Sequence, residues 1–458
     1  MAKLSLILMF LVACGSVTAK QVDAQIDTAL APALTTVSPT SGIVTTAVTL
    51  SGSHFGSVQG TVTIGGMTAT VQSWTDTTVV AVVPDLHPGN ADVAVMTAGG
   101  MAGPLPFKVV LPPTIYINND ANDPTSGFNT ITALTFDPTT GAATQLGDPV
   151  SIGRPTSGFG GCSSSIIVHV PTRRVFATAS NGVGAFDINP VTGALTAVPG
   201  SPFLFGTTTR AFGVVVNKAG TRAWAADFAG TLGVFDIAAN GAMSPVAGSP
   251  FTTTASPDIL ALSMSETFLY ANTEASNILG FSLAATGAPT PLSGSPYAFT
   301  TGFGAGSRPG TDQLYFSGQT NKLGVFQPAA GTGIPAQIAG SPFTLTPPAG
   351  SINGVAFTPD GGRLYVGTFT SGYIFGFNLA ADGTPTAIGG SPWNFTATFQ
   401  DLTCMAVSAD GHLIGVNEGH KQVGVFTLGA DGTPTAVAGS PFTQTTPAEN
   451  ASGLAISF

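Results

Sequence analysis

The chain has 458 residues, more than a single hydrophobic core usually supports, so we expect more than one domain. Only 8% of the residues are charged, against about 25% in an average globular protein, and this argues against a helical fold with charged outer faces. The net charge of −10 argues against non-specific binding to nucleic acid or to anionic lipid. The 59 glycines and 34 prolines instead predict an all-β fold of short strands joined by tight turns.

The N-terminus has the pattern of an export signal. Lys3 is followed by an apolar run over residues 4–13, which is too short to cross a bilayer. The run ends in Leu11-Val12-Ala13-Cys14-Gly15, which resembles the bacterial lipobox. This resemblance implies that residues 1–13 are a signal peptide and that Cys14 becomes the lipidated first residue of the mature protein.

Residues 15–32 are small and polar, as expected of a tether between a membrane anchor and a folded domain. The resulting expectation is a membrane-anchored lipoprotein of the periplasm or the cell surface. Ordinary cleavage after Ala19 is the alternative, and it would leave a soluble secreted protein. The sequence does not decide which membrane leaflet would hold the lipid.

Short strand-like stretches lie about ten residues apart between residues 33 and 110, a spacing typical of a β-sandwich. They are Ala47–Ser51, Gly60–Ile64, Thr68–Ser73, Thr78–Val83, Asp92–Thr97 and Pro106–Val110. Phe55 and Trp74 are expected to fill the space between the sheets, and His54 is expected to be an exposed turn residue.

The same segment resembles the IPT/TIG family of immunoglobulin-like domains. The residues that carry the resemblance are Val37–Gly42, Leu50–Gly56, Val62–Gly66, Trp74–Thr78 and Thr97–Gly100. The resemblance implies a spacer or adhesion module rather than a catalytic domain, joined to the rest by the stiff linker Val110–Pro113.

Two markers then recur in phase from residue 114 to the end. Gly-Ser-Pro followed by an aromatic residue begins at Gly200, Gly248, Gly294, Gly340, Gly390 and Gly439, after a degenerate copy at Gly147. A phenylalanine recurs at Phe136, Phe186, Phe235, Phe281, Phe326, Phe377 and Phe426. Seven copies of each marker predict a repeat protein, and we interpret both as packing and turn residues rather than as a binding code.

One repeat shows the order of its strands. Gly354–Thr358, Arg363–Thr368, Tyr373–Leu379 and Pro385–Gly389 read as four strands separated by turns, which is the blade of a β-propeller. The C-terminal stretch Gly453–Phe458 matches a first strand, whereas Thr114–Asn118 matches a second strand. We therefore predict a seven-bladed propeller over residues 114–458, closed by strands from both of its ends.

The repeats resemble the seven-bladed lactonase family, which includes the propeller-type 6-phosphogluconolactonases, and the surface-layer YVTN repeats. Val355–Val366 and Val407–Leu413 carry this resemblance. It implies the fold and leaves the activity open. The chain also departs from the lactonase pattern, because Arg210 is the one clear cation for a phosphosugar and the His-containing motif is replaced by Arg210–Gly213 and Asp401–Cys404.

Propeller ligands bind where the loops before the innermost strands meet the loops between second and third strands. The ligand-binding candidates at these positions are Arg210, Asp258, Glu274, Asp401, Glu418, His420, Glu449 and Asn450, with Asp227 nearby. A carboxylate beside a histidine could activate water against a lactone carbonyl, and an arginine could stabilise the oxyanion. The catalytic candidates are therefore Asp401, Glu449, His420 and Arg210. The alternative is that these charges are solvated loop residues.

No cofactor or metal site is expected. The five histidines are scattered, and Asn118–Asp123 has the oxygen density of a calcium loop without the following glutamate, so Asx turns are the preferred interpretation. Cys162 and Cys404 fall in non-adjacent repeats and are expected to be buried thiols.

Two functions remain open. The first is an exported, lipid-anchored surface protein whose propeller face binds a glycan, protein or small ligand, with the immunoglobulin-like domain as spacer. The second is an extracytoplasmic lactonase acting on that face, so the sequence leaves it uncertain whether the protein is an enzyme. A purely structural surface-layer role would require self-association, which the sequence does not show.

Overall fold

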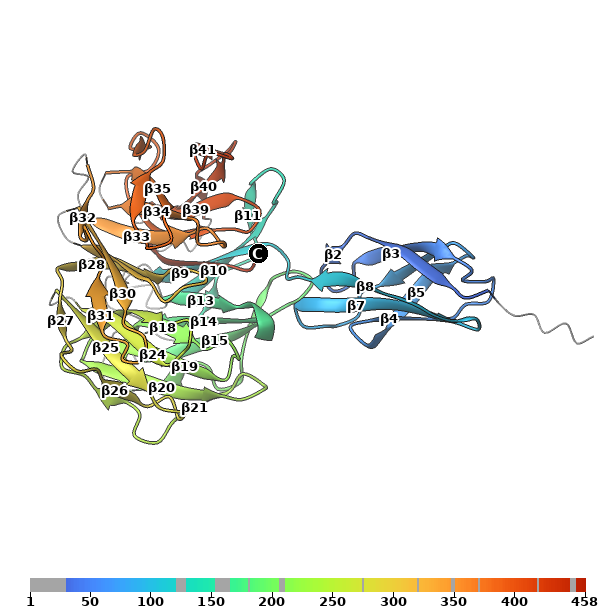
Figure 1. The fold of residues 1–458 in the computed structure, drawn as a ribbon, viewed down its shortest axis with the longest axis horizontal. Helices are drawn as coiled ribbons and strands as arrows, with labels where there is room; N and C mark the ends of the chain where they lie inside the picture. The colour runs from blue at the N-terminus through green and yellow to red at the C-terminus, as the bar shows by residue number, and fades with distance from the viewer. Residues whose placement is uncertain are drawn as a thin grey trace, which may run out of the picture.

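A computed structural model shows an all-β protein with a sandwich domain on one side and a propeller on the other (Figure 1). The structure describes residues 30–120, 129–152, 165–179, 182–205, 211–273, 276–318, 321–346, 351–369, 371–417, 420–444 and 450–458.

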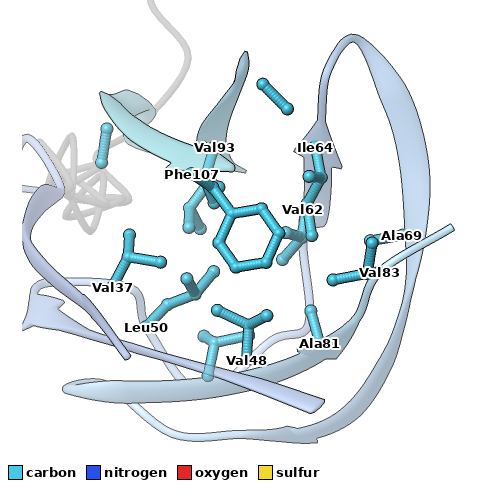
Figure 2. Packing of buried hydrophobic residues seen from close by; sticks show 14 of the residues in the cluster. Val37, Val48, Leu50, Val62, Ile64, Ala69, Ala81, Val83, Val93 and Phe107 are labelled. Carbon is cyan, nitrogen blue, oxygen red and sulfur yellow. The ribbon is translucent and has the colours of Figure 1, made fainter. Parts of the chain in front are cut away.

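The first domain has eight strands in the order β1-β3-β6-β5-β4-β7-β8-β2. Valine and isoleucine alternate with polar residues along these strands, so one face of each sheet packs inward. Phe107 lies at the centre of this core, surrounded by Val48, Leu50 and Val62 (Figure 2). The strands are β1 (Ala33–Ser38), β2 (Ser41–Gly42), β3 (Ala47–Ser53), β4 (Thr61–Ile64), β5 (Met67–Trp74), β6 (Thr78–Val82), β7 (Gly89–Thr97) and β8 (Gly100–Val109).

The predicted aromatic pair of this domain is present. Phe55 is buried, Trp74 is half-buried, and their ring centroids are 6.2 Å apart. His54 is exposed, with a positive φ of 59°, in the turn after β3.

The remaining described strands form seven five-stranded antiparallel sheets, which are the seven predicted blades. We number the blades 1 to 7 from the one that contains both ends of the propeller. Blade 1 is β43 (Asn450–Ile456), β9 (Thr114–Asp120), β10 (Thr130–Phe136), β11 (Ala143–Gln145) and β12 (Val150–Ser151). Blade 2 is β13 (Ile166–His169), β14 (Arg174–Ala179), β15 (Gly182–Ile188), β16 (Leu195–Ala197) and β17 (Phe203–Leu204), with a short 3₁₀ helix, η1 (Val170–Thr172), after β13.

Blades 3 to 5 repeat this order. Blade 3 is β18 (Ala211–Val216), β19 (Arg222–Asp227), β20 (Thr231–Ile237), β21 (Met243–Pro245) and β22 (Phe251–Thr252). Blade 4 is β23 (Pro257–Leu262), β24 (Phe268–Thr273), β25 (Asn277–Leu283), β26 (Pro289–Pro291) and β27 (Tyr297–Ala298). Blade 5 is β28 (Thr301–Ser307), β29 (Leu314–Gly318), β30 (Lys322–Pro328), β31 (Pro335–Gln337) and β32 (Phe343–Thr344).

Blades 6 and 7 complete the ring. Blade 6 is β33 (Ile352–Phe357), β34 (Arg363–Thr368), β35 (Tyr373–Leu379), β36 (Pro385–Ala387) and β37 (Trp393–Asn394). Blade 7 is β38 (Leu402–Val407), β39 (His412–Asn417), β40 (Gln422–Leu428), β41 (Pro434–Ala436) and β42 (Phe442–Thr443).

The outer strand of a blade differs from the sequence prediction. The Gly-Ser-Pro turn divides it into two short strands, and both pair with the third strand of the blade. In blade 4, for example, Phe281 on β25 pairs with Pro291 on β26, and Ile278 pairs with Tyr297 on β27. Proline has no N–H to donate to a ladder, so the strand is interrupted there. The serine of the turn compensates, because Ser295 Oγ accepts the N–H of Gly280 at 3.0 Å.

The ring closes as predicted. The C-terminal strand β43 pairs antiparallel with β9, from Asn450 opposite Asp120 to Ile456 opposite Ile115. Ser457 then accepts the N–H of Thr114 at 3.0 Å and donates to the carbonyl of Pro112 at 2.6 Å. The seven recurring phenylalanines are all buried in the propeller, which confirms their interpretation as core residues.

The two domains contact each other next to this closure. Arg173, after η1, forms a 2.6 Å ion pair with Asp85 of the first domain. His87 Nδ1 lies 3.1 Å from the carbonyl oxygen of Pro171. The β6–β7 connection therefore contacts the connection between the first and second strands of blade 2.

Candidate ligand-binding face of the propeller

The innermost strands β43, β13, β18, β23, β28, β33 and β38 contact one another around the propeller axis. Six of them have a register shift in their pairing with the second strand, near the end where the inner strand begins. Such bulges leave backbone groups unpaired in the ladder, and buried groups of this kind need other partners. This end of the ring is the face on which the sequence placed its candidates.

Buried polar side chains of the second strands supply those partners. Asn272 accepts the N–H of Ile259 at 2.7 Å and donates to the carbonyl of Gly302 in the next blade at 2.7 Å. Ser317 accepts the N–H of Gly304 at 2.7 Å, and Thr178 donates to the carbonyl of Phe212 at 3.1 Å. These residues hold the bulges in place, so they shape the face without being exposed on it.

Two of the predicted site residues come together in blade 7. Asp401 lies directly before β38, and His420 lies between β39 and β40. Asp401 Oδ2 and His420 Nδ1 are 3.9 Å apart, with 17% of the aspartate and 41% of the histidine side chain exposed. This distance is that of an ion pair rather than a hydrogen bond. The imidazole of His420 remains partly open to solvent on this face.

A row of polar groups connects this pair to blade 6. The carbonyl of Gln400, next to Asp401, accepts the N–H of Gly372 at 3.0 Å. Thr396 donates to the carbonyl of Ser371 at 2.5 Å and to Asn394 Oδ1 at 2.6 Å.

Asn394 in turn donates to the hydroxyl oxygen of Tyr373 at 3.2 Å. Asn394, Thr396 and Gln400 are exposed, whereas Tyr373 and the neighbouring Trp393 are half-buried. We name this row the blade 6–7 rim, which consists of Tyr373, Asn394, Thr396, Ser371, Gln400, Asp401 and His420.

The other predicted site residues are placed differently. Asp258 lies inside β23 rather than in the loop before it and is only 2% exposed. Asp227 is buried at the end of β19, where its carboxylate accepts the N–H of Ala229 at 3.1 Å. The backbone of Asn450 begins β43. Arg210, Glu274, Glu418, Glu449, Cys14 and Cys162 lie outside the described residues.

The calcium-like segment needs a correction. Asn118, Asn119 and Asp120 belong to β9 rather than to Asx turns. Asn118 Nδ2 donates to the carbonyl of Ser165 at 3.3 Å, and Asn119 Nδ2 donates to the hydroxyl of Thr132 at 2.8 Å. The side chain of Asn118 therefore bonds to blade 2, and that of Asn119 bonds within blade 1. The rest of this segment, residues 121–123, lies outside the described residues.

Cys404 is a buried thiol that donates to the carbonyl of Ser452 at 3.2 Å. The part of the chain that the structure describes holds no group of three or more His, Cys, Asp or Glu residues able to bind a metal ion. It also contains no helix that is long and apolar enough to span a membrane.

The sequence analysis missed most of the blade 6–7 rim. Tyr373, Ser371, Asn394 and Thr396 carry no charge, and hydroxyl and amide residues are common in every loop of this chain. The one available signal was Trp393, which is the only tryptophan among the aromatic residues that follow Gly-Ser-Pro.

Comparison with known proteins agrees with this architecture. Residues 32–109 match the IPT/TIG domain family. No curated protein matches the chain.

Solved structures match the propeller. A protein from Lactobacillus plantarum has a TM-score of 0.61 at 14% identity, covering 75% of this chain and 99% of its own. A putative 6-phosphogluconolactonase from Bacteroides uniformis has a TM-score of 0.59 at 16% identity, with coverage of 75% and 99%. The periplasmic gluconolactonase of Pseudomonas aeruginosa has a TM-score of 0.58 at 14% identity, with coverage of 76% and 99%. At these identities the likeness shows a shared fold.

Proposed function

We propose that this chain is an exported, lipid-anchored surface protein whose propeller face binds a glycan, with the IPT/TIG domain as a spacer. The observation that carries the proposal is the blade 6–7 rim, a continuous row of hydroxyl and amide groups beside two half-buried aromatic rings. Neutral donors and acceptors complement sugar hydroxyls, and aromatic faces cover the apolar faces of sugar rings. A protein loop or a small polar ligand is the other occupant that this chemistry would accept.

Export and anchoring rest on the sequence alone. The apolar run before Cys14 and the small polar residues after it support a lipid anchor followed by a tether. Labelling cells with radioactive palmitate should mark the wild-type protein and leave a Cys14→Ser variant unlabelled. A wild-type protein that carries no label would replace the anchor with cleavage after Ala19.

A second function, hydrolysis of a lactone, is favoured by one observation, the contact between Asp401 and His420. A histidine oriented by a carboxylate can act as a general base toward water. The fold likeness to a gluconolactonase is compatible with this chemistry but does not select it.

One experiment separates the two functions. Purified residues 20–458 would be applied to a glycan array and to a panel of lactones, beside the variants Asn394→Ala, Asp401→Asn and His420→Ala. We expect glycan binding that weakens at least about tenfold in Asn394→Ala, and no lactone turnover. His54→Ala and Asp92→Asn, both exposed in the first domain, are the matched controls and should behave as wild type.

Lactone turnover that disappears in Asp401→Asn and His420→Ala would overturn the binding function and establish a lactonase. Glycan binding that is unchanged in Asn394→Ala would place the binding site elsewhere on the protein.

A further inference from the structure

The opposite end of the blades, where the first and second strands connect, has a repeated contact between neighbours. The first residue of the second strand reaches into the turn between the third and fourth strands of the next blade. Arg174 donates to the carbonyl of Ala239 at 2.8 Å, Arg222 to that of Ala285 at 2.6 Å, and Arg363 to that of Ala430 at 2.6 Å. At three of the boundaries between blades the chain thus supplies a guanidinium group from this position. At a fourth, between blades 5 and 6, Arg308 donates to the carbonyl of Ala380 at 2.7 Å.

The position in the strand, rather than the type of residue, places this side chain against the next blade. Each of these arginines lies against the turn glycine of the next blade, namely Gly241, Gly287 and Gly432. Gln313 takes the position in blade 5, where it lies against Gly383 and donates to the carbonyl of Ala381 at 3.2 Å.

Blade 4 has Phe268 at this position. Its ring lies against Gly333 of blade 5, the equivalent glycine, but a phenylalanine has no hydrogen to donate to the turn. A cavity of about 450 Å³ lies at this boundary. It is lined by Ser263, Ser265, Thr267, Phe268, Asp312, Pro328, Ala329, Ala330 and Gly331.

The lining of this cavity has the groups that a guanidinium group requires. Asp312 provides a carboxylate, of which Oδ1 accepts the N–H of Met264 at 2.9 Å, and a carboxylate can accept further bonds. Ser263, Ser265 and Thr267 form a chain of hydroxyls, with 3.2 Å and 2.7 Å between successive oxygens. The half-buried ring of Phe268 offers a face for a planar cation to stack on.

We propose that the cavity between blades 4 and 5 binds the guanidinium group of an arginine side chain presented by a partner peptide. The bound group supplies the guanidinium that this boundary lacks, bonded to Asp312 and stacked on the ring of Phe268. Arginine suits this site better than lysine because its planar guanidinium group both stacks and donates along two directions. This site lies on the face opposite the blade 6–7 rim and does not depend on the proposed glycan binding.

Isothermal titration of residues 20–458 with N-acetyl-arginine amide tests the proposal, with N-acetyl-citrulline amide as an uncharged ligand of the same shape. We expect the citrulline compound to bind at least about tenfold more weakly, because it lacks the charge. Asp312→Asn should weaken the binding of the arginine compound by a similar factor, whereas Asp92→Asn, the same change at an exposed site of the first domain, should not.

The variant Phe268→Arg adds an independent readout. Its side chain should fill the cavity as Arg222 does one blade earlier, so ligand binding should be lost while the melting temperature stays equal or rises. Free L-arginine binding more tightly than the blocked amide would point to a small metabolite instead of a peptide. Equal binding of the arginine and citrulline compounds, or binding unchanged by Asp312→Asn, would overturn the proposal.

Discussion

Single aromatic residues of the second strands connect five of the seven blades to the next. Tyr116, Tyr270, Tyr315 and Tyr365 are fully buried, and each hydroxyl donates to the carbonyl of a turn glycine in the following blade, at 2.6 to 2.8 Å. Trp224 makes the same contact to Gly287 through Nε1 at 2.8 Å. Phe176 and Ile414 occupy this position in blades 2 and 7, where the side chain has no donor. A buried hydroxyl without this partner would cost free energy, so the bond specifies how the blades pack.

These phenols make the stability of the propeller depend on alkaline pH. Burial raises the pKa of Tyr315 and of Tyr365 to about 12, from an ordinary value of 10.0. The folded state then holds these protons more tightly than the unfolded chain does. Both residues therefore stabilise the fold fully below pH 10, and this contribution is lost as the pH rises toward 12. We expect the double variant Tyr315→Phe/Tyr365→Phe to lose less melting temperature than wild type between about pH 9 and pH 11.

Circular dichroism melts at a series of pH values measure this difference. At about pH 8 the double variant should be less stable by about 2 kcal/mol, since two buried carbonyl partners lose their donors. Tyr297→Phe is the control for that loss, because the Tyr297 hydroxyl bonds to Ser293 in an exposed position. Equal alkaline destabilisation of the double variant and wild type would show that other groups cause it.

At the level of elements, the sequence was most informative where a residue type recurs in phase. The recurring phenylalanines and Gly-Ser-Pro turns predicted seven blades, because each unit needs the same core residue and the same turn. The tyrosines of the second strands recur as well, but their hydrogen bonds join different blades, and pairing across blades cannot be read from spacing alone. The blade 6–7 rim was missed for a different reason. Tyr373 begins β35 and Asn394 ends β37, but the residue type at these two positions changes from blade to blade, so no repeat marks them. Asp258 was expected in a loop, but β23 begins one residue before it. The strand has a register shift at this point, and the side chain of Asp258 is buried.

The serine of the Gly-Ser-Pro turn is predicted to stabilise its blade. Ser295→Ala removes the acceptor for the N–H of Gly280, and a partly buried donor without a partner costs about 1 kcal/mol. Urea unfolding followed by tryptophan fluorescence should show a lower midpoint. Ser293→Ala, two residues earlier and exposed, is the matched control and should leave the midpoint unchanged. Equal midpoints for the two variants would mean that the backbone of the turn suffices.

At the level of the whole molecule, the two ends of the propeller meet beside the linker to the first domain. Ser457 bonds to both Pro112 and Thr114, and β43 covers the edge of β9. The C-terminus thus lies near the junction of the domains, as Figure 1 shows. A cavity of about 690 Å³ at this junction is lined by residues of both domains, among them Lys108 and Phe458. The same few residues therefore close the ring and bond to the linker from the first domain.

Removal of residues 450–458 should open the propeller without unfolding the first domain. The deletion exposes the edge of β9 and takes Ala451, Leu454 and Ala455 out of the cores on either side of blade 1. We expect the propeller to lose its cooperative thermal transition, whereas the first domain, which has its own core around Phe107, keeps a separate one. Differential scanning calorimetry distinguishes the two transitions. A synthetic peptide of residues 450–458 added in trans should restore the propeller transition, and a scrambled peptide should not. A truncated chain that melts as wild type would show that the six complete blades are stable without closure.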